Sequence, residues 1–317
     1  MSDINVTFAG LPLVSPITIE PTGTVLTPAT ARSAVEAGVG AVYAPPLDAD
    51  RMKNRDDAEE VTDNNQNDDS RRESLRIVRR LNIESYLDEI TELAREVDVP
   101  IIAPLACERS AEWLTLAEQL REAGATAVEI RPSVEELSRT QKSDAIEKAL
   151  LRITASVAGR IDIPVLVRIP AGTYGLISLV QALGDSDAAA ITIRPNTGVG
   201  TFNLTSPALE AVDAYGAARE SLFLLQLNAC RALYRRVTPH LGLQLPSSRS
   251  ESIAEALLAG ATVGVIPIAG DDPTATTRTV EEFHTALDGW LRHQQADSLF
   301  AVRGILSESR LSSSLEN

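Results

Sequence analysis

The sequence predicts a single (βα)8 barrel that is preceded by a β-hairpin. Short apolar segments with strand character alternate with amphipathic helical segments about eight times over roughly 250 residues, as this fold requires. Apolar residues form 44 % of the 317-residue chain but aromatic residues only 4 %, so the core is aliphatic. Such a core is typical of parallel strands that are buried on both faces. No Gly-x-Gly-x-x-Gly phrase follows the first strand, which argues against a doubly wound dinucleotide-binding sheet.

The hairpin and the first βα unit are predicted from local patterns. Residues 5–13 alternate apolar and polar side chains around a glycine, which indicates a short hairpin. Residues 16–20 read as the first strand. Residues 28–37 read as a helix, with Thr27 as its N-cap and a proline in its first turn. Residues 40–44 are the second strand.

The chain changes character at residues 48–75. This segment is rich in Asp-Asp, Glu-Glu, Asn-Asn and Arg-Arg pairs and has almost no apolar periodicity. We interpret it as a polar insertion, which is either a disordered or partly helical cover or a catalytic lid. A third alternative is that the protein is a subunit of an assembly and that this segment binds its partner.

Regular alternation resumes after the insertion. The remaining strands are predicted at residues 100–104, 126–131, 164–169, 188–194, 241–245 and 262–268. The remaining helices are predicted at residues 84–97, 110–123, 143–157, 174–183, 227–237, 250–259 and 280–294. We expect one barrel domain over residues 1–306, an irregular stretch from about 195 to 206, and a flexible Ser-rich tail at 307–317.

A repeated Ala-Gly phrase marks the turn between a helix and the next strand. Gly38, Gly124 and Gly260 each follow a predicted helix and precede a predicted strand. We expect these glycines to adopt the left-handed conformation that ends a helix. The repeat is therefore a feature of the fold and needs no functional explanation.

Charge and cysteine content limit the possible partners. The net charge of −15 disfavours nucleic acid and anionic lipid as partners. The chain shows no signal-peptide pattern and no apolar run of the ~20 residues that span a bilayer, so we expect a cytoplasmic protein. Cys107 and Cys230 are too few for a disulfide framework and lack neighbouring ligands for a metal site.

The chemically most informative feature is an arginine at the end of three predicted strands. Arg131, Arg168 and Arg194 each close an apolar run, and a proline follows at once or one residue later. The carboxyl ends of parallel strands meet at one rim, so three guanidinium groups are predicted to converge there. Glu129 shares a strand face with Arg131, and Glu20 ends the first strand. Two interpretations remain open: a pocket for an anionic small molecule, or a buried ion-pair network that fills the barrel mouth.

Several phrases resemble the dihydroorotate dehydrogenase-like family of flavin-dependent (βα)8 barrels. They are Phe-Ala-Gly-Leu-Pro-Leu-Val-Ser-Pro-Ile at residues 8–17, Ala-Gly-Val-Gly-Ala-Val at 37–42 and Phe-Ala-Val-Arg-Gly-Ile-Leu-Ser at 300–307. The phrases occur in consistent order along nearly the whole chain. The resemblance implies bound flavin mononucleotide (FMN), oxidation of a dihydropyrimidine CH–CH bond, and a homo-oligomer.

The resemblance also assigns roles to individual positions. Arg168 stands where the family has the lysine that meets the flavin ring, and Ser133 is the hydroxyl nearest to the position of the family's acid/base residue. These two are the catalytic candidates. The cofactor-binding candidates are Glu20, Glu129, Arg131, Arg194, Ser247, Ser248 and Gly270.

Most of these positions differ in residue type from the family pattern. Pro246 and Pro267, in the turns that usually hold the flavin phosphate, have no N–H to donate. The sequence therefore leaves two functions open. One is an FMN-dependent oxidoreductase, which would be yellow. The other is a non-catalytic anion-binding or scaffold barrel, which would be colourless.

Overall fold

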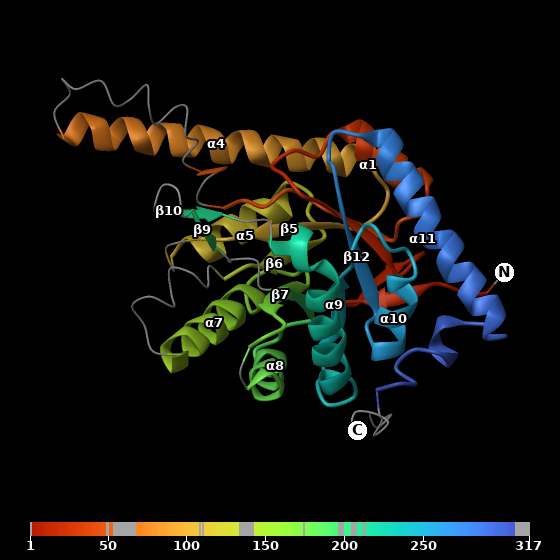
Figure 1. Cartoon of the computed structure of the whole chain (residues 1–317). Helices are drawn as coiled ribbons and strands as arrows, with labels where there is room; N and C mark the ends of the chain where they lie inside the picture. The colour runs from red at the N-terminus through yellow and green to blue at the C-terminus, as the bar shows by residue number, and fades with distance from the viewer. Residues whose placement is uncertain are drawn as a thin grey trace.

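The computed structural model describes residues 2–48, 51–52, 68–107, 109, 111–132, 143–173, 175–195, 200–203, 208–211 and 214–307. Within these residues eight parallel strands close into a barrel, and helices surround it (Figure 1). The predicted (βα)8 fold is confirmed.

The bounds of the elements follow the chain order. The barrel strands are β3 (Ile17–Pro21), β4 (Ala41–Tyr43), β5 (Ile101–Leu105), β6 (Ala127–Ile130), β7 (Val165–Pro170), β8 (Ala190–Arg194), β11 (His240–Gln244) and β12 (Val263–Ile268). The helices are α1 (Pro28–Glu36), α4 (Asp68–Glu96), α5 (Glu112–Glu122), α7 (Ser143–Ala158), α8 (Leu176–Gly184), α9 (Ala214–Leu233), α10 (Ser252–Ala259) and α11 (Pro273–His293), followed by a 3-10 turn at Leu299–Ala301. Around the barrel the strands run β11-β12-β3-β4-β5-β6-β7-β8, and β8 pairs with β11 to close the ring.

The predicted N-terminal hairpin closes the amino-terminal end of the barrel. It consists of β1 (Val6–Phe8) and β2 (Leu11–Leu13), paired antiparallel. Phe8 is fully buried and packs with inward-facing residues of the barrel strands. Gly242 of β11 lies against the Phe8 ring inside the barrel. A Cβ on Gly242 would lie only 3.3 Å from that ring, so a glycine leaves space for it. His240 Nδ1 accepts a hydrogen bond of 2.8 Å from the Ala9 N–H, which fixes the turn of the hairpin.

The interior of the barrel changes from apolar to charged toward its carboxyl end. Alternate residues of a strand point to the same side, so Leu166 and Arg168 of β7 both face the interior. On β8 the same alternation runs from Ala190 through Thr192 to Arg194. The interior residues near the amino-terminal end, such as Leu166 and Ala190, pack against the hairpin. The interior residues near the carboxyl end, such as Arg168, are polar. The strand sequences therefore place their charged residues at the barrel mouth.

The first disagreement with the sequence concerns the start of the helix that follows the insertion. Residues 68–75 of the insertion are helical, as the partly helical alternative predicts. The helix predicted at residues 84–97 begins at Asp68 in the structure, so residues 68–75 of the predicted insertion belong to α4. Figure 1 shows the N-terminal end of α4 reaching beyond the barrel. Tyr86 of α4 is buried and donates a hydrogen bond of 2.7 Å to the Pro45 carbonyl oxygen. The interpretation of residues 49–50 and 53–67 lies outside the described residues.

The second disagreement concerns residues 195–233. The stretch predicted as irregular contains a small antiparallel sheet, β9 (Gly200–Asn203) with β10 (Ala208–Ala211). The helix predicted at 227–237 is α9, which begins at Ala214. Neither short strand shows the alternation that predicts a hairpin, and Gly216 weakened the helical signal near the start of α9.

The last helix also begins earlier than predicted. It was expected at residues 280–294, but α11 begins at Pro273. The Asp272 carboxylate caps it by accepting a hydrogen bond of 2.9 Å from the Ala275 N–H, and the proline occupies the first turn. The sequence carries this start signal as Asp272 followed by Pro273. No helix in the described ranges is both long enough and apolar enough to cross a membrane. The predicted tail beyond residue 307 lies outside the described residues.

Candidate functional site

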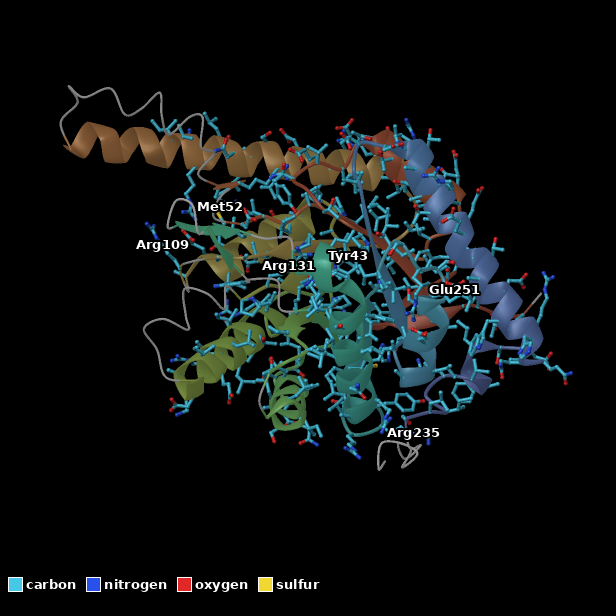
Figure 2. The ribbon with its side chains drawn as sticks, in the orientation of Figure 1. Tyr43, Met52, Arg109, Arg131, Arg235 and Glu251 are labelled. Atoms are coloured by element: carbon cyan, nitrogen blue, oxygen red, sulfur yellow. The ribbon has the colours of Figure 1, made fainter. Side chains whose placement is uncertain are left out.

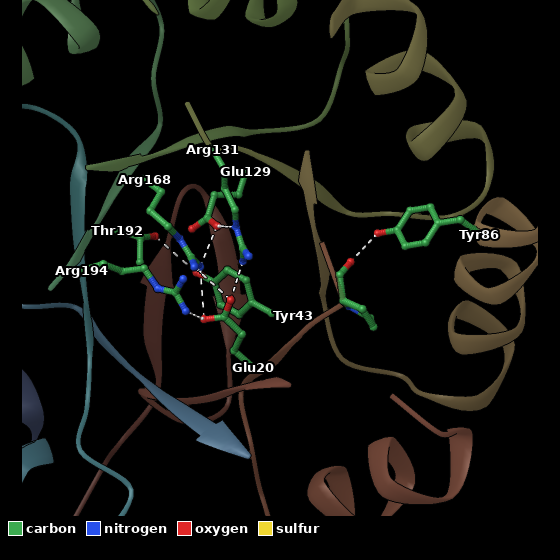
Figure 3. Close-up of polar contacts among 9 residues, drawn as sticks. Glu20, Tyr43, Tyr86, Glu129, Arg131, Arg168, Thr192 and Arg194 are labelled. Carbon is green, nitrogen blue, oxygen red and sulfur yellow. Dashed lines mark hydrogen bonds and ion pairs between the residues drawn. The ribbon is translucent and has the colours of Figure 1, made fainter. Parts of the chain in front are cut away.

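Five charged residues from four barrel strands meet at the carboxyl end of the barrel (Figure 3). Glu20 lies on β3, Glu129 on β6, Arg168 on β7 and Arg194 on β8, and Arg131 directly follows β6. The strand register pairs Glu129 with Leu166 and Arg168 with Thr192, so Glu129 lies deeper in the barrel than Arg168. Arg194 pairs with Pro170 and lies nearer the mouth. We call these five residues the arginine cluster. Figure 2 shows Arg131 within the barrel, whereas Arg235 lies at its periphery.

The carboxylate of Glu20 is the centre of the arginine cluster. Its Oε1 accepts from Arg131 Nη2 at 2.5 Å and from Arg168 Nη1 at 3.0 Å. Its Oε2 accepts from Arg168 Nη2 at 3.2 Å and from Arg194 Nη2 at 2.8 Å. Three guanidinium groups from separate strands therefore share one carboxylate.

The second carboxylate binds only two of the arginines. Glu129 Oε2 lies 2.7 Å from Arg131 Nε and 2.7 Å from Arg168 Nη2. Its Oε1 is buried and has no hydrogen-bond partner among the described residues. The Nε atoms of Arg168 and Arg194 are also buried and unpartnered there. A buried polar atom without a partner destabilises the folded protein. These three atoms can therefore still accept or donate a hydrogen bond, and doing so would remove that cost.

The arginine cluster is buried to different depths. The side chains of Glu129 and Glu20 are 0 % and 3 % exposed, whereas that of Arg194 is 27 % exposed. Among the described residues of the arginine cluster, three guanidinium groups against two carboxylates leave one positive charge in excess. Arg194 is the most accessible of the three arginines, so it is the part of the arginine cluster that an anion reaches first.

The pKa shifts follow from these charges. Burial alone would raise the pKa of Glu20, but Arg168, Arg194 and Arg131 outweigh it and hold that pKa far below its usual value. Burial lowers the pKa of Arg168, but Glu129 and Glu20 more than offset this and raise it. Arg194 differs: burial and repulsion from Arg168 lower its pKa to about 10 despite attraction by Glu20. The charge of Arg194 is therefore less well compensated than that of Arg168.

Two uncharged residues beneath the arginine cluster were missed by sequence reasoning. The Tyr43 ring lies below Arg168, with the guanidinium carbon 5.9 Å from the ring centroid. The Tyr43 hydroxyl lies 3.5 Å from Thr192 Oγ1. Burial and the nearby charge of Glu129 raise the pKa of Tyr43, so the phenol stays protonated. Thr192 could have been found from the alternation on β8, since it stands two residues before Arg194.

The turns expected to hold a flavin phosphate do not form an open cradle at Gly270. A Cβ on Gly270 would lie 1.9 Å from the carbonyl oxygen of Val25, so the loop after β3 already covers that face. The Thr27 N–H also donates a hydrogen bond of 2.8 Å to the Gly270 carbonyl oxygen. Close packing of two loops thus explains this glycine without a ligand.

The neighbouring serine turn is also a poor phosphate site. Ser247 is half-buried and Ser248 is exposed, just before α10. Glu251 takes the N-cap position of α10, and Glu255 lies in its first turn. The Glu251 carboxylate would repel a phosphate there, and Arg249, the cation of this turn, is already paired with Glu255. The residues present therefore do not fit the FMN phosphate. Ser133, the other catalytic candidate, lies outside the described residues.

No group of three or more potential metal ligands occurs among the described residues. Cys107 and Cys230 are buried free thiols. Burial raises the pKa of Cys107 to about 12, and it raises that of Cys230 as well. Neither thiol is poised to act as a nucleophile.

Comparisons with known proteins give matches in structure alone. No protein-family model and no curated protein matches the chain. A mandelate oxidase structure matches with a TM-score of 0.58 over 96 % of this chain and 81 % of that chain, at 12 % sequence identity. A protein of Pediococcus acidilactici described as a lactate oxidase matches with a TM-score of 0.58 over 95 % and 78 %, also at 12 % identity. At this identity the likeness shows that the chain shares the barrel fold of these oxidases.

Proposed function

We propose that this barrel binds a small anionic molecule at its mouth, with Arg194 as the first point of contact. The observation that carries the proposal is the uncompensated positive charge of the arginine cluster at the rim where barrel proteins build their sites. A network made only for stability would be neutral, because an excess buried charge is costly. An anion that pairs with Arg194 removes that cost.

A titration of anions onto the purified protein tests this function. Acetate and inorganic phosphate are titrated separately by calorimetry at constant ionic strength, against wild type and Arg194→Met. We expect at least one anion to bind wild type and to lose about tenfold or more in affinity in the variant, as for loss of a charge-assisted hydrogen bond. Arg292→Met, at an exposed ion pair on α11, is the matched control and should change nothing. The proposal is refuted if wild type binds neither acetate nor phosphate.

A second candidate function is a flavin-dependent oxidoreductase. It is supported by the barrel likeness to oxidases named for mandelate and lactate, and by the family phrases in the sequence. In that case Arg168 would be the cation beside the flavin ring, as the resemblance implies. Dihydropyrimidine oxidation has the support of the phrases alone. The poor fit at Gly270 and Ser247 places this candidate second.

The visible spectrum separates the two candidates. A flavoprotein absorbs near 450 nm (roughly, as a property of the cofactor class), and mass spectrometry of the released small molecules would identify FMN. The first candidate predicts a colourless protein that does not take up added FMN. A yellow protein with stoichiometric FMN would make the oxidoreductase the correct function.

A further inference from the structure

The Glu20 carboxylate is held in the way that a bound carboxylate ligand would be held. Arg168 donates a hydrogen bond to each of its oxygens, from Nη1 to Oε1 at 3.0 Å and from Nη2 to Oε2 at 3.2 Å. Arg131 adds one hydrogen bond to Oε1 and Arg194 adds one to Oε2. Each oxygen thus receives two guanidinium donors. A guanidinium fork can bind a carboxylate or a phosphate, but the donors here serve two oxygens in one plane, which is all that a carboxylate presents. The further oxygens of a phosphate would have no donor from these contacts.

The two glutamates of the arginine cluster have different roles. Glu129 is fully buried, binds through one oxygen, and pairs with Arg131 and Arg168. It is the counter-charge of the inner two arginines. Glu20 binds through both oxygens and is the only described carboxylate that pairs with Arg194. If Glu20 released Arg194, the most exposed guanidinium would be free for another anion.

We infer that Glu20 is an internal competitor, which occupies the carboxylate position of the anion site until a small carboxylate ligand displaces it from Arg194. This inference rests on the proposed function and narrows its ligand to the carboxylate class. An exchange of one carboxylate for another keeps Arg194 paired throughout, so no unpaired buried charge arises. The affinity for external carboxylates is then limited by the strength of the contacts that Glu20 already makes.

Removing the competitor while leaving its space tests the inference. Glu20→Ala deletes the two-carbon carboxylate group, for which acetate is the matching probe. We expect acetate to bind Glu20→Ala at least about tenfold more tightly than wild type in calorimetry at constant ionic strength. Inorganic phosphate, which is tetrahedral, should gain less. An equal or larger gain for phosphate would overturn the assignment to carboxylates.

Two matched variants separate competition from net charge. Glu129→Ala changes the charge of the arginine cluster by the same amount but leaves Glu20 in place, so no comparable gain is expected. Glu20→Gln keeps the bulk of the side chain and should gain less than Glu20→Ala. An equal gain in Glu129→Ala would show that charge alone acts, and would overturn the inference.

The outcomes also distinguish this inference from the proposed function. If wild type binds acetate and Glu20→Ala binds it no better, the anion site stands and the competition is wrong. If wild type binds neither acetate nor phosphate, the proposed function itself is wrong, whatever the variants bind. Where Glu20→Ala fails to fold, Glu20→Asp withdraws the carboxylate by one methylene and keeps the charge. It should bind acetate more tightly than wild type, and equal affinities would overturn the inference.

Discussion

Arg168 and Arg194 enter the same cluster, but their contributions to stability should differ. Arg168 is 7 % exposed and contacts both carboxylates, whereas Arg194 is 27 % exposed and contacts only Glu20 among the described carboxylates. Removing Arg168 takes hydrogen-bond donors away from both buried carboxylates, and breaking a buried ion pair in this way costs about 3–5 kcal/mol. A partly exposed arginine is replaced by water at lower cost.

We therefore predict that Arg168→Met lowers the free energy of unfolding by about 3–5 kcal/mol. Arg194→Met should lower it by less than about 2 kcal/mol, since one charge-assisted hydrogen bond is lost. Urea unfolding followed by circular dichroism measures both. If Arg168→Met is as stable as wild type, the ion pairs of Arg168 do not contribute to the free energy of unfolding.

The depressed pKa of Glu20 predicts a dependence of stability on acid. A carboxylate whose pKa is lower in the folded than in the unfolded state stabilises the protein above the unfolded pKa and loses that contribution as the pH falls. The usual pKa of this group is 4.5. We expect the free energy of unfolding to fall steadily as the pH drops below about 4.5.

The variant Glu20→Gln isolates this contribution. It should be less stable than wild type at neutral pH, and the difference should shrink on acidification, as urea unfolding at a series of pH values would show. A difference that stays constant down to the lowest pH at which both proteins fold would argue that Glu20 does not titrate with a depressed pKa.

At the residue scale, the sequence predicted the charged half of the site but not the rest. Arg131, Arg168 and Arg194 stood out because a strand-ending arginine is rare in an otherwise apolar run. Tyr43 closes a strand too, but an aromatic residue there looks like ordinary core. Gln244 ends β11 with a buried, unpartnered Oε1 among the described residues, and a polar strand end gave no separate signal. Side-chain pairing depends on distances between strands, which no single strand encodes.

The same contrast holds at the scale of the elements. The repeated Ala-Gly phrase predicted three helix ends correctly, because Gly38, Gly124 and Gly260 all have positive φ, at 97°, 108° and 109°. Helix starts were harder to predict. The first turns of α4 and α9 are polar or Gly-containing, so periodicity began too late in both.

The glycine between α5 and β6 gives a test at this scale. Gly124→Ala should destabilise the protein by about 1–3 kcal/mol, because a side chain is strained at positive φ. The added Cβ would also lie 2.7 Å from the Ala94 Cβ. Thermal or urea unfolding of the variant measures the effect.

Gly289 offers a matched control within a helix. It lies inside α11, and a Cβ there meets nothing within 4 Å. Gly289→Ala should therefore stabilise the protein by about 0.4–1 kcal/mol. Opposite signs for the two substitutions are the expected result. Equal signs would contradict the assigned role of the helix-ending glycine.

For the whole molecule, the fold was predictable because barrel closure repeats one local unit. Each strand–helix pair carries its own periodicity, and the aliphatic composition requires two covered faces. The order of strands around the barrel then follows the chain order. The function was less predictable, since many unrelated functions share this fold. What distinguishes this chain is the contrast between a net charge of −15 and a positively charged mouth.

That contrast predicts how salt changes the stability of the protein. A surplus of 15 negative charges repels itself over distances comparable to the Debye length. This length falls from about 30 Å at 0.01 M salt to about 10 Å at 0.1 M. Surface pairs such as Arg32–Glu96 weaken over the same range, but each contributes only about 0–1 kcal/mol. The buried arginine cluster is screened much less.

We therefore expect the melting temperature at neutral pH to rise as sodium chloride increases from about 0.01 to 0.1 M, where screening changes most. Differential scanning fluorimetry measures it. Near the isoelectric point of about 4.7 the net charge vanishes, and the same salt step should leave the melting temperature unchanged or slightly lower. A fall at neutral pH would mean that favourable surface pairs outweigh the overall repulsion. In that case specific ion pairs would stabilise the acidic surface by more than the repulsion among its negative charges destabilises it.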